Sequence, residues 1–410
     1  MTVDPAAALR ALLDAAISSA QPAICVPPAL PAPPDGRTIV VGFGKAAASM
    51  ARAVEDHYTG PVTGVVVAPH GSSQDHGCRS IQVLEAGHPI ADDASVTAAK
   101  AIMTAVSVLT ANDLVLILIS GGGSALFEWP RDGVSLSEMQ AVVRQLMHTG
   151  ANIGELNTVR ATLSRVKGGG LARAIGPAQA VALVISDVVG DDIAVIASGP
   201  AVAPPDLRAA PDILARYGVD ASDDILRVMA GAAQAHDVTP AIPHHLIATP
   251  AMALAAAASL ARNLGLKPIV LGDNIEGTPD VAADLHLQAA ARLQPGEVLL
   301  SGGELVCRVT GAGRGGPNLA FCLELLNRQA DATDLWALAC DTDGRDGNSG
   351  LAGAMVRPGA KARAQAEGLD IASFRVNADS LGLFSALADT IDTGWTGTNV
   401  NDFRAIFRAS

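Results

Sequence analysis

The chain has 410 residues and a formal net charge of −13, with 49% hydrophobic residues but only 3% aromatic ones. Its length predicts more than one domain, and its acidic balance argues against binding to nucleic acid or to an anionic membrane surface. The five cysteines form no C-x-x-C pair and no apolar run reaches the ~18 residues that span a bilayer, so we expect no zinc knuckle, disulfide framework or membrane helix. We therefore expect a soluble protein, and the scattered cysteines fit a reducing cytoplasm.

The first half of the chain predicts repeated strand–helix units. An amphipathic helix over 6–20 and a proline-rich connector precede them. Strands are expected at 38–41, 62–68, 114–119 and 181–186, and helices at 45–57, 91–109, 135–148 and 154–166. Such alternation implies a largely parallel sheet with helices on its faces.

A stretch rich in proline, alanine and aspartate, from about 202 to 243, is the expected domain junction. Beyond it, strands are expected at 245–247, 268–271, 297–301, 305–309 and 335–340, with an alanine-rich helix at 250–264. These elements predict a second sheet. The sequence therefore predicts an α/β protein of two domains, residues 1–238 and 239–410.

A glycine-rich turn follows the first predicted strand, in residues 40–47 with the sequence VVGFGKAA. Glycines let the backbone approach a ligand closely, and the start of the next helix offers free N–H groups to an anion. Lys45 adds a full positive charge. We interpret the segment as a phosphate site centred on Lys45, with a plain surface turn as the alternative.

The same segment matches the G-x-G-x-x-A form of the dinucleotide fingerprint, which makes a nicotinamide-binding domain a rival interpretation. That interpretation needs a carboxylate about 20 positions later, at the end of the second strand, to hold the ribose. The second strand ends at Pro69 and His70 without a carboxylate. Phosphate binding by Lys45 is therefore the better prediction.

A second glycine loop, residues 120–124 with the sequence SGGGS, follows another apolar strand. Successive glycines can fold their N–H groups around an anion, although a flexible turn is the alternative for this loop alone. Ligands of open α/β sheets gather at the carboxyl ends of strands, so we expect both loops at one site. The predicted nucleotide- or phosphate-binding residues are Gly42, Gly44, Ser120, Gly121, Gly122, Gly123 and Ser124.

Two clusters of aspartates stand in loops after predicted strands: Asp187 with Asp191 and Asp192, and Asp341 with Asp343 and Asp346. Phosphoryl transfer needs Mg²⁺ to neutralise phosphate charge, and Mg²⁺ prefers carboxylates with several waters retained. The predicted metal ligands are Asp191, Asp343 and Asp346. Helix capping or turn formation is the alternative for both clusters.

Lysine and arginine together number only 28, and three of these residues lie in or beside glycine-rich segments: Arg160, Lys167 and Arg314. Arginine offers a planar fork to a carboxylate or phosphate. Arg160 and Lys167 are therefore candidates for substrate binding, and for each of the three a solvated surface charge is equally compatible.

These segments, in this order, resemble the class II glycerate 2-kinase family, which is also labelled hydroxypyruvate reductase and carries a C-terminal MOFRL domain. The resemblance rests on residues 42–47, 85–89, 120–127, 156–160, 164–171, 186–200, 301–304, 313–318 and 342–353. It implies a larger Rossmann-like domain and a smaller α/β domain, with a MOFRL-like segment over about 295–400. The active site would lie in a cleft between them.

The resemblance further implies ATP- and Mg²⁺-dependent phosphorylation of D-glycerate at its 2-hydroxyl. The family's catalytic lysine falls on Lys45, and its substrate-contacting acidic loop falls on Asp187, Asp191 and Asp192. Where family members place a catalytic arginine this chain has Pro317, and Arg314 is expected to supply that charge. The alternative activity is NAD(P)H-dependent reduction of hydroxypyruvate.

Overall fold

A computed structural model describes residues 4–72, 77–234, 238–307, 311–329 and 334–409, and the chain divides into two compact units. One unit, Pro22–Ile247, is called here the parallel-sheet unit. The other, called the mixed-sheet unit, combines Met1–Gln21 with Ala248–Ser410. The division differs from the predicted boundary at 238–239, because the first helix of the chain belongs with the C-terminal half.

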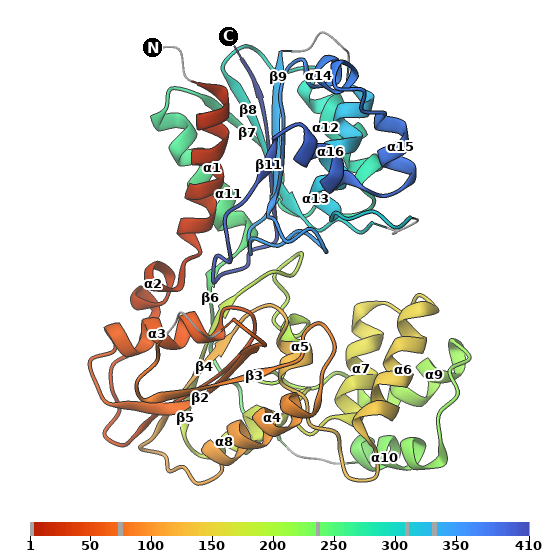
Figure 1. The fold of residues 1–410 in the computed structure, drawn as a ribbon. Helices are drawn as coiled ribbons and strands as arrows, with labels where there is room; N and C mark the ends of the chain where they lie inside the picture. Colours follow the sequence, from red (N-terminus) through yellow and green to blue (C-terminus); the bar gives the residue numbers. More distant parts are fainter. Residues whose placement is uncertain (1–3, 73–76, 235–237, 308–310, 330–333, 410) are drawn as a thin grey trace. The chain divides into compact units, whose positions relative to one another are not determined.

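The parallel-sheet unit contains a six-stranded sheet in the order β3-β2-β1-β4-β5-β6 (Figure 1). Its strands are β1 (Thr38–Phe43), β2 (Val62–Pro69), β3 (Ile81–Ala86), β4 (Leu114–Ile119), β5 (Gln179–Ile185) and β6 (His244–Ala248). The pairs that join β1 to β2 and β4, β2 to β3, and β4 to β5 are all parallel. The strand order reverses between β1 and β4, which makes their carboxyl ends the topological switch point at which open α/β sheets bind ligands.

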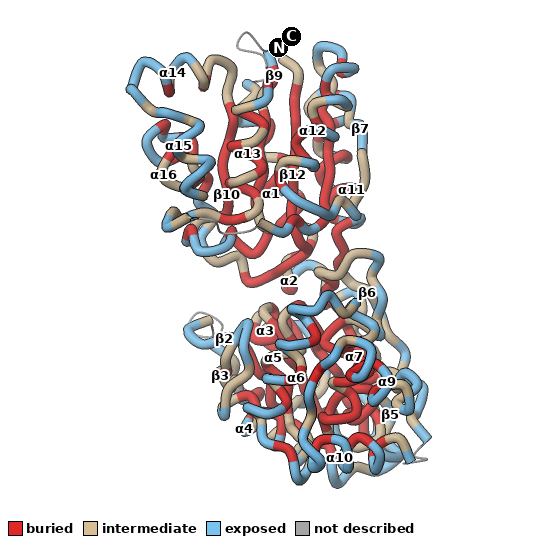
Figure 2. The backbone as a smooth tube through the Cα atoms, turned by 90° about the vertical axis from the view of Figure 1, so that its right-hand side faces the viewer, coloured by how far each residue is buried: buried red, intermediate tan, exposed pale blue. Residues whose placement is uncertain are grey.

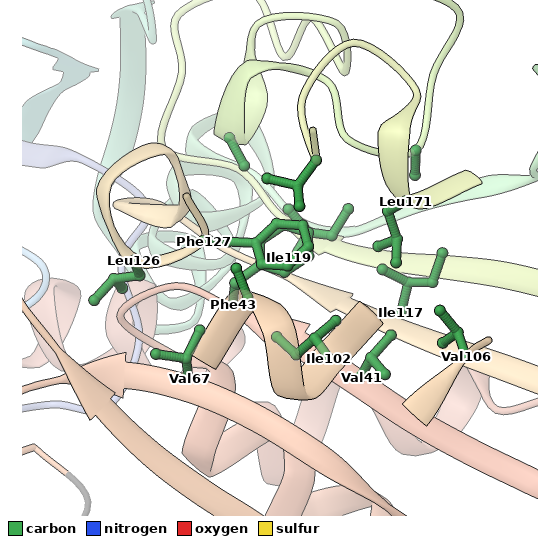
Figure 3. Close-up of a cluster of buried hydrophobic side chains, with 14 of the residues drawn as sticks. Val41, Phe43, Val67, Ile102, Val106, Ile117, Ile119, Leu126, Phe127 and Leu171 are labelled. Atoms are coloured by element: carbon green, nitrogen blue, oxygen red, sulfur yellow. The ribbon is translucent and has the colours of Figure 1, made fainter. Parts of the chain in front are cut away.

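Helices bury both faces of this sheet, which is why β1 and β4 are apolar and buried over their whole length. Helix α3 (Ala47–His57) covers one face, and α4 (Asp93–Ala105) with α8 (Gly170–Ile175) covers the other (Figure 1). In the core under α4 and α8 the rings of Phe43 and Phe127 stack with centroids 4.5 Å apart (Figure 3). Since Phe127 directly follows the short helix α5 (Gly123–Leu126), the stack holds the second glycine loop against the end of β1.

A helical subdomain of the same unit has an apolar core of its own. It comprises α6 (Leu136–His148), α7 (Ile153–Leu163), α9 (Ala210–Arg216) and α10 (Asp223–Gln234) (Figure 1). The predicted start of α6 is confirmed, because Ser135 and Glu138 form a capping box. Asn152 and Glu155 form a second one at the start of α7.

The mixed-sheet unit has a sheet in the order β11-β10-β9-β12-β8-β7. Its strands are β7 (Lys267–Gly272), β8 (Glu297–Gly303), β9 (Leu335–Asp341), β10 (Gly353–Val356), β11 (Thr390–Ile391) and β12 (Asp402–Arg408). β12 runs antiparallel to both β8 and β9, and these central strands are buried (Figure 2). One face carries α1 (Pro5–Ser19) and α11 (Pro250–Asn263); the other carries α12 (Pro279–Ala290), α13 (Pro317–Arg328), α14 (Ala360–Ala366), α15 (Ile371–Val376) and α16 (Ser380–Ala386) (Figure 1).

The predicted α/β class with two sheets is confirmed, and three details of the prediction are wrong. The expected strand 245–247 belongs to β6 of the first sheet rather than to the second. Leu305, expected to open a strand, forms only an isolated bridge with Gly277, and residues 308–310 lie outside the described residues. Strands β3, β10, β11 and β12 were not predicted. No helix within the described ranges is long and apolar enough to cross a membrane.

A buried histidine links α12 to β8 in the mixed-sheet unit. The ring nitrogens of His286 lie 2.7 Å from Ala282 O and 2.7 Å from Ser301 Oγ. Burial, with a smaller contribution from the positive charge of Arg404, lowers the pKa of His286 to about 4. A histidine whose folded-state pKa is below its unfolded value makes the fold less stable as pH falls, because the unfolded chain takes up the proton first.

We expect the titration of His286 to account for about 1–2 kcal/mol of lost stability between about pH 6.5 and pH 5. In the variant His286→Gln the ionising group is gone and a polar side chain remains near Ser301. Chemical denaturation at both pH values should therefore show a smaller pH-dependent loss for this variant than for the wild type. His148→Gln, an exposed histidine on α6, is the control that should keep the wild-type loss. Equal losses in His286→Gln and wild type would refute the assignment.

Candidate active site

The carboxyl ends of β1 and β4 hold the two predicted glycine loops together. The backbone N–H of Lys45 donates to Gly121 O at 2.8 Å, and that of Ala46 donates to Ser120 Oγ at 3.0 Å. Ser120 N in turn donates to Phe43 O at 3.2 Å. These bonds fix the loop after β1 against the loop after β4 at the switch point of the sheet.

The glycines of these loops stand where a side chain has no room. A Cβ atom at Gly44 would lie 2.2 Å from Ser120 Oγ, and its φ of +135° is one that other residues rarely adopt. A Cβ atom at Gly121 would lie 1.6 Å from Asp187 Oδ2. The carboxylate of Asp187, which follows β5, therefore lies directly against the backbone of the second loop.

The side chains of Lys45 and His88 both lie close to Gly122. A Cβ atom on Gly122 would lie 2.8 Å from Cδ2 of His88 and 3.4 Å from Cγ of Lys45. Lys45 and Asp187 are half-buried, and His88 is exposed. His88 was not among the predicted site residues, although it lies in the segment 85–89, which contributes to the family resemblance. The ends of β1, β3, β4 and β5 thus bring together a lysine, an imidazole, a glycine-lined backbone and a carboxylate, a combination suited to a phosphate group.

Lys167 has a different role from the predicted contact with substrate. Its side chain is fully buried, and Nζ lies 2.8 Å from Ser124 O, 3.1 Å from Phe127 O and 3.4 Å from Glu128 Oε2. A lysine ammonium has three donors, and these three acceptors engage them. Lys167 is therefore a positioning residue that holds the end of the second glycine loop.

The acidic loop after β5 contains one carboxylate oxygen with unused capacity. Asp191 has a left-handed φ of 55°, and its Oδ1 is buried and has no hydrogen-bond partner. Asp192 instead accepts a hydrogen bond from Ala194 N at 2.9 Å within the loop. A buried, unsatisfied carboxylate oxygen is costly, so Asp191 fits contact with a bound cation.

The predicted metal ligands belong to both units: Asp191 to the parallel-sheet unit, and Asp343 and Asp346 to the mixed-sheet unit. Within the described part of the chain, no group of three or more histidine, cysteine, aspartate or glutamate side chains could hold a metal ion. Mg²⁺ commonly uses only one or two carboxylates together with substrate phosphates. Asp187 and Asp191 fit that mode, whereas a site made of protein ligands alone does not.

The two candidate aspartates of the mixed-sheet unit, Asp343 and Asp346, accept hydrogen bonds from nearby backbone N–H groups. Both carboxylate oxygens of Asp346 accept hydrogen bonds at the start of α13, from Asn318 N at 3.0 Å and Leu319 N at 2.8 Å. Burial raises the pKa of Asp346 to about 7. Asp343 Oδ1 accepts from Arg345 N at 2.8 Å within its own turn. Capping and turn formation, the alternative to metal binding, therefore describe Asp343 and Asp346 better.

The two candidate arginines lie in different units. Arg314 is exposed in the mixed-sheet unit, where its guanidinium donates to Ser349 O at 3.1 Å, and Pro317 forms the first turn of α13. Arg160, on α7 of the parallel-sheet unit, donates to Asn157 Oδ1 at 3.2 Å. Its guanidinium is largely buried, and burial lowers the pKa of Arg160.

Together, the fold and this geometry define a two-unit α/β protein with two glycine loops at the switch point of a Rossmann-type sheet. Residues 8–230 match the family model described as a domain of unknown function (DUF4147), and residues 297–402 match the MOFRL family. The chain belongs to the class II glycerate 2-kinase family, as its sequence segments indicated.

Relatives in this family carry two kinds of name. An Agrobacterium vitis protein named "Putative hydroxypyruvate reductase" is 43% identical, over 97% of this chain and 93% of its own. The glycerate 2-kinase of Pyrococcus horikoshii is 36% identical, over 89% of this chain and 86% of its own. The crystal structure of glycerate kinase from Thermotoga maritima matches 98% of this chain and 99% of its own with a TM-score of 0.89, at 32% identity.

Proposed function

We propose that this protein transfers a phosphoryl group from MgATP to the 2-hydroxyl of D-glycerate. The observation that carries the proposal is the convergence of Lys45, the two glycine loops and Asp187 at the switch point, in a chain of the glycerate kinase family. The cytoplasmic location expected from the sequence remains a prediction.

Each group at the site has a part in such a transfer. The ammonium of Lys45 offsets negative charge on the transferring phosphoryl group, and the loop backbone offers N–H donors to the phosphates. Asp187 orients the attacking hydroxyl or accepts its proton. Bound with the nucleotide, Mg²⁺ supplies further charge neutralisation, and Asp187 and Asp191 are the residues that would hold it. Arg160, in the parallel-sheet unit, is a candidate cation for an anionic group of a substrate, and the role expected for Arg314 of the mixed-sheet unit remains a prediction.

The surroundings of β2 argue against the reductase alternative. At the end of this strand a nicotinamide-binding domain needs a carboxylate for the ribose hydroxyls. Two carboxylates that contact the residues just after this strand are engaged: Asp92 pairs with His70 at 2.8 Å, and Glu85 accepts from Gly71 N at 3.1 Å. The positive charge of Lys45 inside the glycine turn also favours the binding of phosphate groups over the binding of a nicotinamide dinucleotide.

Parallel assays test the proposal. ADP release is followed with MgATP and D-glycerate, and NADH absorbance is followed with hydroxypyruvate. We expect D-glycerate-dependent ADP release and a product that enolase accepts, since enolase uses 2-phosphoglycerate and not 3-phosphoglycerate. Oxidation of NADH without D-glycerate-dependent ADP release would replace the kinase assignment with the reductase one.

A further inference from the structure

A cavity of about 360 Å³ opens beside the second glycine loop within the parallel-sheet unit. Its walls come from the segment between β3 and α4, from α5, from α6 and from Arg160 on α7. Two wall residues continue the candidate active site directly: Ser124 follows the glycines of the loop, and Pro89 follows His88. A ligand whose phosphates rest on the loop can therefore extend into this cavity.

The cavity is lined mainly by apolar side chains, and Met139 among them also belongs to the core of the helical subdomain. Leu136, Met139, Val143 and Met147 lie on one face of α6, and Ile90 lies on another wall. Ile90 is 63% exposed and Met147 is 57% exposed, and neither belongs to the core of the helical subdomain. Methionines adapt to flat rings and make favourable sulfur–aromatic contacts. A three-carbon polyhydroxy acid has no apolar face to cover such a wall and would lose the hydration of its hydroxyls there.

The charges around the cavity call for an anionic ligand. Glu128 is neutralised by Lys167, and its Oε1 also accepts from Ser164 Oγ at 2.5 Å. Arg160 bonds only to the neutral amide of Asn157 and has no ion pair with any described residue. Arg144, exposed at the rim, has no hydrogen bond or ion pair within the described chain. The carboxylate of Glu128 acts on Arg160 from nearby, but the two form no ion pair, so the half-buried guanidinium keeps N–H donors for a carboxylate or phosphate of the ligand.

Resting on the kinase assignment above, we propose that this cavity binds the nucleoside part of the phosphoryl donor. The base lies against the apolar face of α6, and Arg160 faces the phosphate chain where it leaves the cavity for the second glycine loop. A ligand with a flat apolar end and an anionic end matches both kinds of wall. The size, between about 300 and 1,000 Å³, is that of ordinary small-molecule sites.

Binding measured without turnover tests this assignment. The probes are ADP and inorganic pyrophosphate, titrated by calorimetry in the absence of D-glycerate. In Val143→Trp an indole fills the cavity, so ADP should bind about tenfold or more weakly while pyrophosphate, which lacks a nucleoside, changes less than about twofold. Met147→Glu places a negative charge at the exposed rim and should also weaken ADP. Gln145→Glu adds the same charge to α6 at an exposed position outside the cavity and should bind ADP like the wild type.

The outcomes separate this inference from the kinase assignment. Wild-type affinity for ADP in both Val143→Trp and Met147→Glu, or a wild type that does not bind ADP, would overturn the nucleoside cavity. The nucleoside assignment would also fail if these variants raised the half-saturating concentration of D-glycerate in the kinase assay and left that of ATP unchanged. The cavity would then hold the acceptor. If the wild type binds ADP in the cavity but releases no ADP when D-glycerate is added, the nucleoside assignment stands and only D-glycerate as the acceptor is refuted.

Discussion

Lys45→Ala is expected to lower kcat for D-glycerate phosphorylation by about 10²–10³-fold, the effect typical of removing one preorganised group that stabilises transition-state charge. The backbone of Lys45 is fixed by its bond to Gly121 O, and that bond does not depend on the side chain. The variant should therefore keep the wild-type thermal midpoint and lose mainly turnover. Steady-state ADP release and thermal unfolding of the same preparation measure the two quantities.

Two further variants make the Lys45 result specific. Lys100→Ala removes an exposed lysine of α4 in the same unit, where Nζ lies 5.7 Å from the ring of Trp129, and should leave kcat near the wild-type value. Lys45→Arg keeps the charge but changes its reach, so partial activity is expected. Near-normal turnover in Lys45→Ala would refute a catalytic role, and Lys45 would then be interpreted as a charge beside a glycine turn.

The sequence predicted the positions of the two glycine loops because their signals are local. Strands β1 and β4 are continuous apolar runs followed by glycines, and this pattern can be recognised without knowing how the rest of the chain folds. The strand order, by contrast, is not written in any one segment. That β1 and β4 are neighbours, and that Asp187 lies against Gly121, needed the structure.

Strand β12 was missed because its buried charges make its sequence look like a surface segment. Arg404 is fully buried, forms an ion pair with Asp402 and lies 5.4 Å from the ring of Phe321. Its antiparallel partners, β8 and β9, precede it by more than 60 residues, so no hairpin signal marks the pairing. Lys167 misled for the same reason, since a lysine is rarely buried unless it is paired, and Glu128, which pairs with it, lies 39 positions earlier.

The place of the first helix could not be read from its own residues either. The apolar face of α1 predicted a helix correctly, and Leu9, Leu12 and Leu13 are fully buried. An apolar face does not say which core it joins, however. The packing of α1 against α11, β9 and β12 places it in the mixed-sheet unit. This unit therefore combines two separate parts of the chain, which a single boundary along the sequence cannot describe.

Gly121→Ala should separate catalysis from folding at the candidate site. The new methyl group would overlap Asp187 Oδ2, and the end of a side chain can move more cheaply than backbone. Gly121 does not have a positive φ, so alanine is compatible with its backbone. We expect the carboxylate of Asp187 to be displaced by about an ångström, which lowers kcat by about 10²-fold with little loss of stability.

Gly231→Ala is the matched control, because Gly231 lies in the middle of α10 and a methyl group there meets nothing within 4 Å. Alanine favours a helix interior over glycine by about 1 kcal/mol, so this variant should be as stable as the wild type or slightly more so, with unchanged kcat. Wild-type kcat in Gly121→Ala would show that turnover does not depend on the contact between Asp187 and the second glycine loop. A large loss of stability would instead mean that the loop backbone moves in place of the carboxylate, and that Gly121 is required for the fold before it is required for the site.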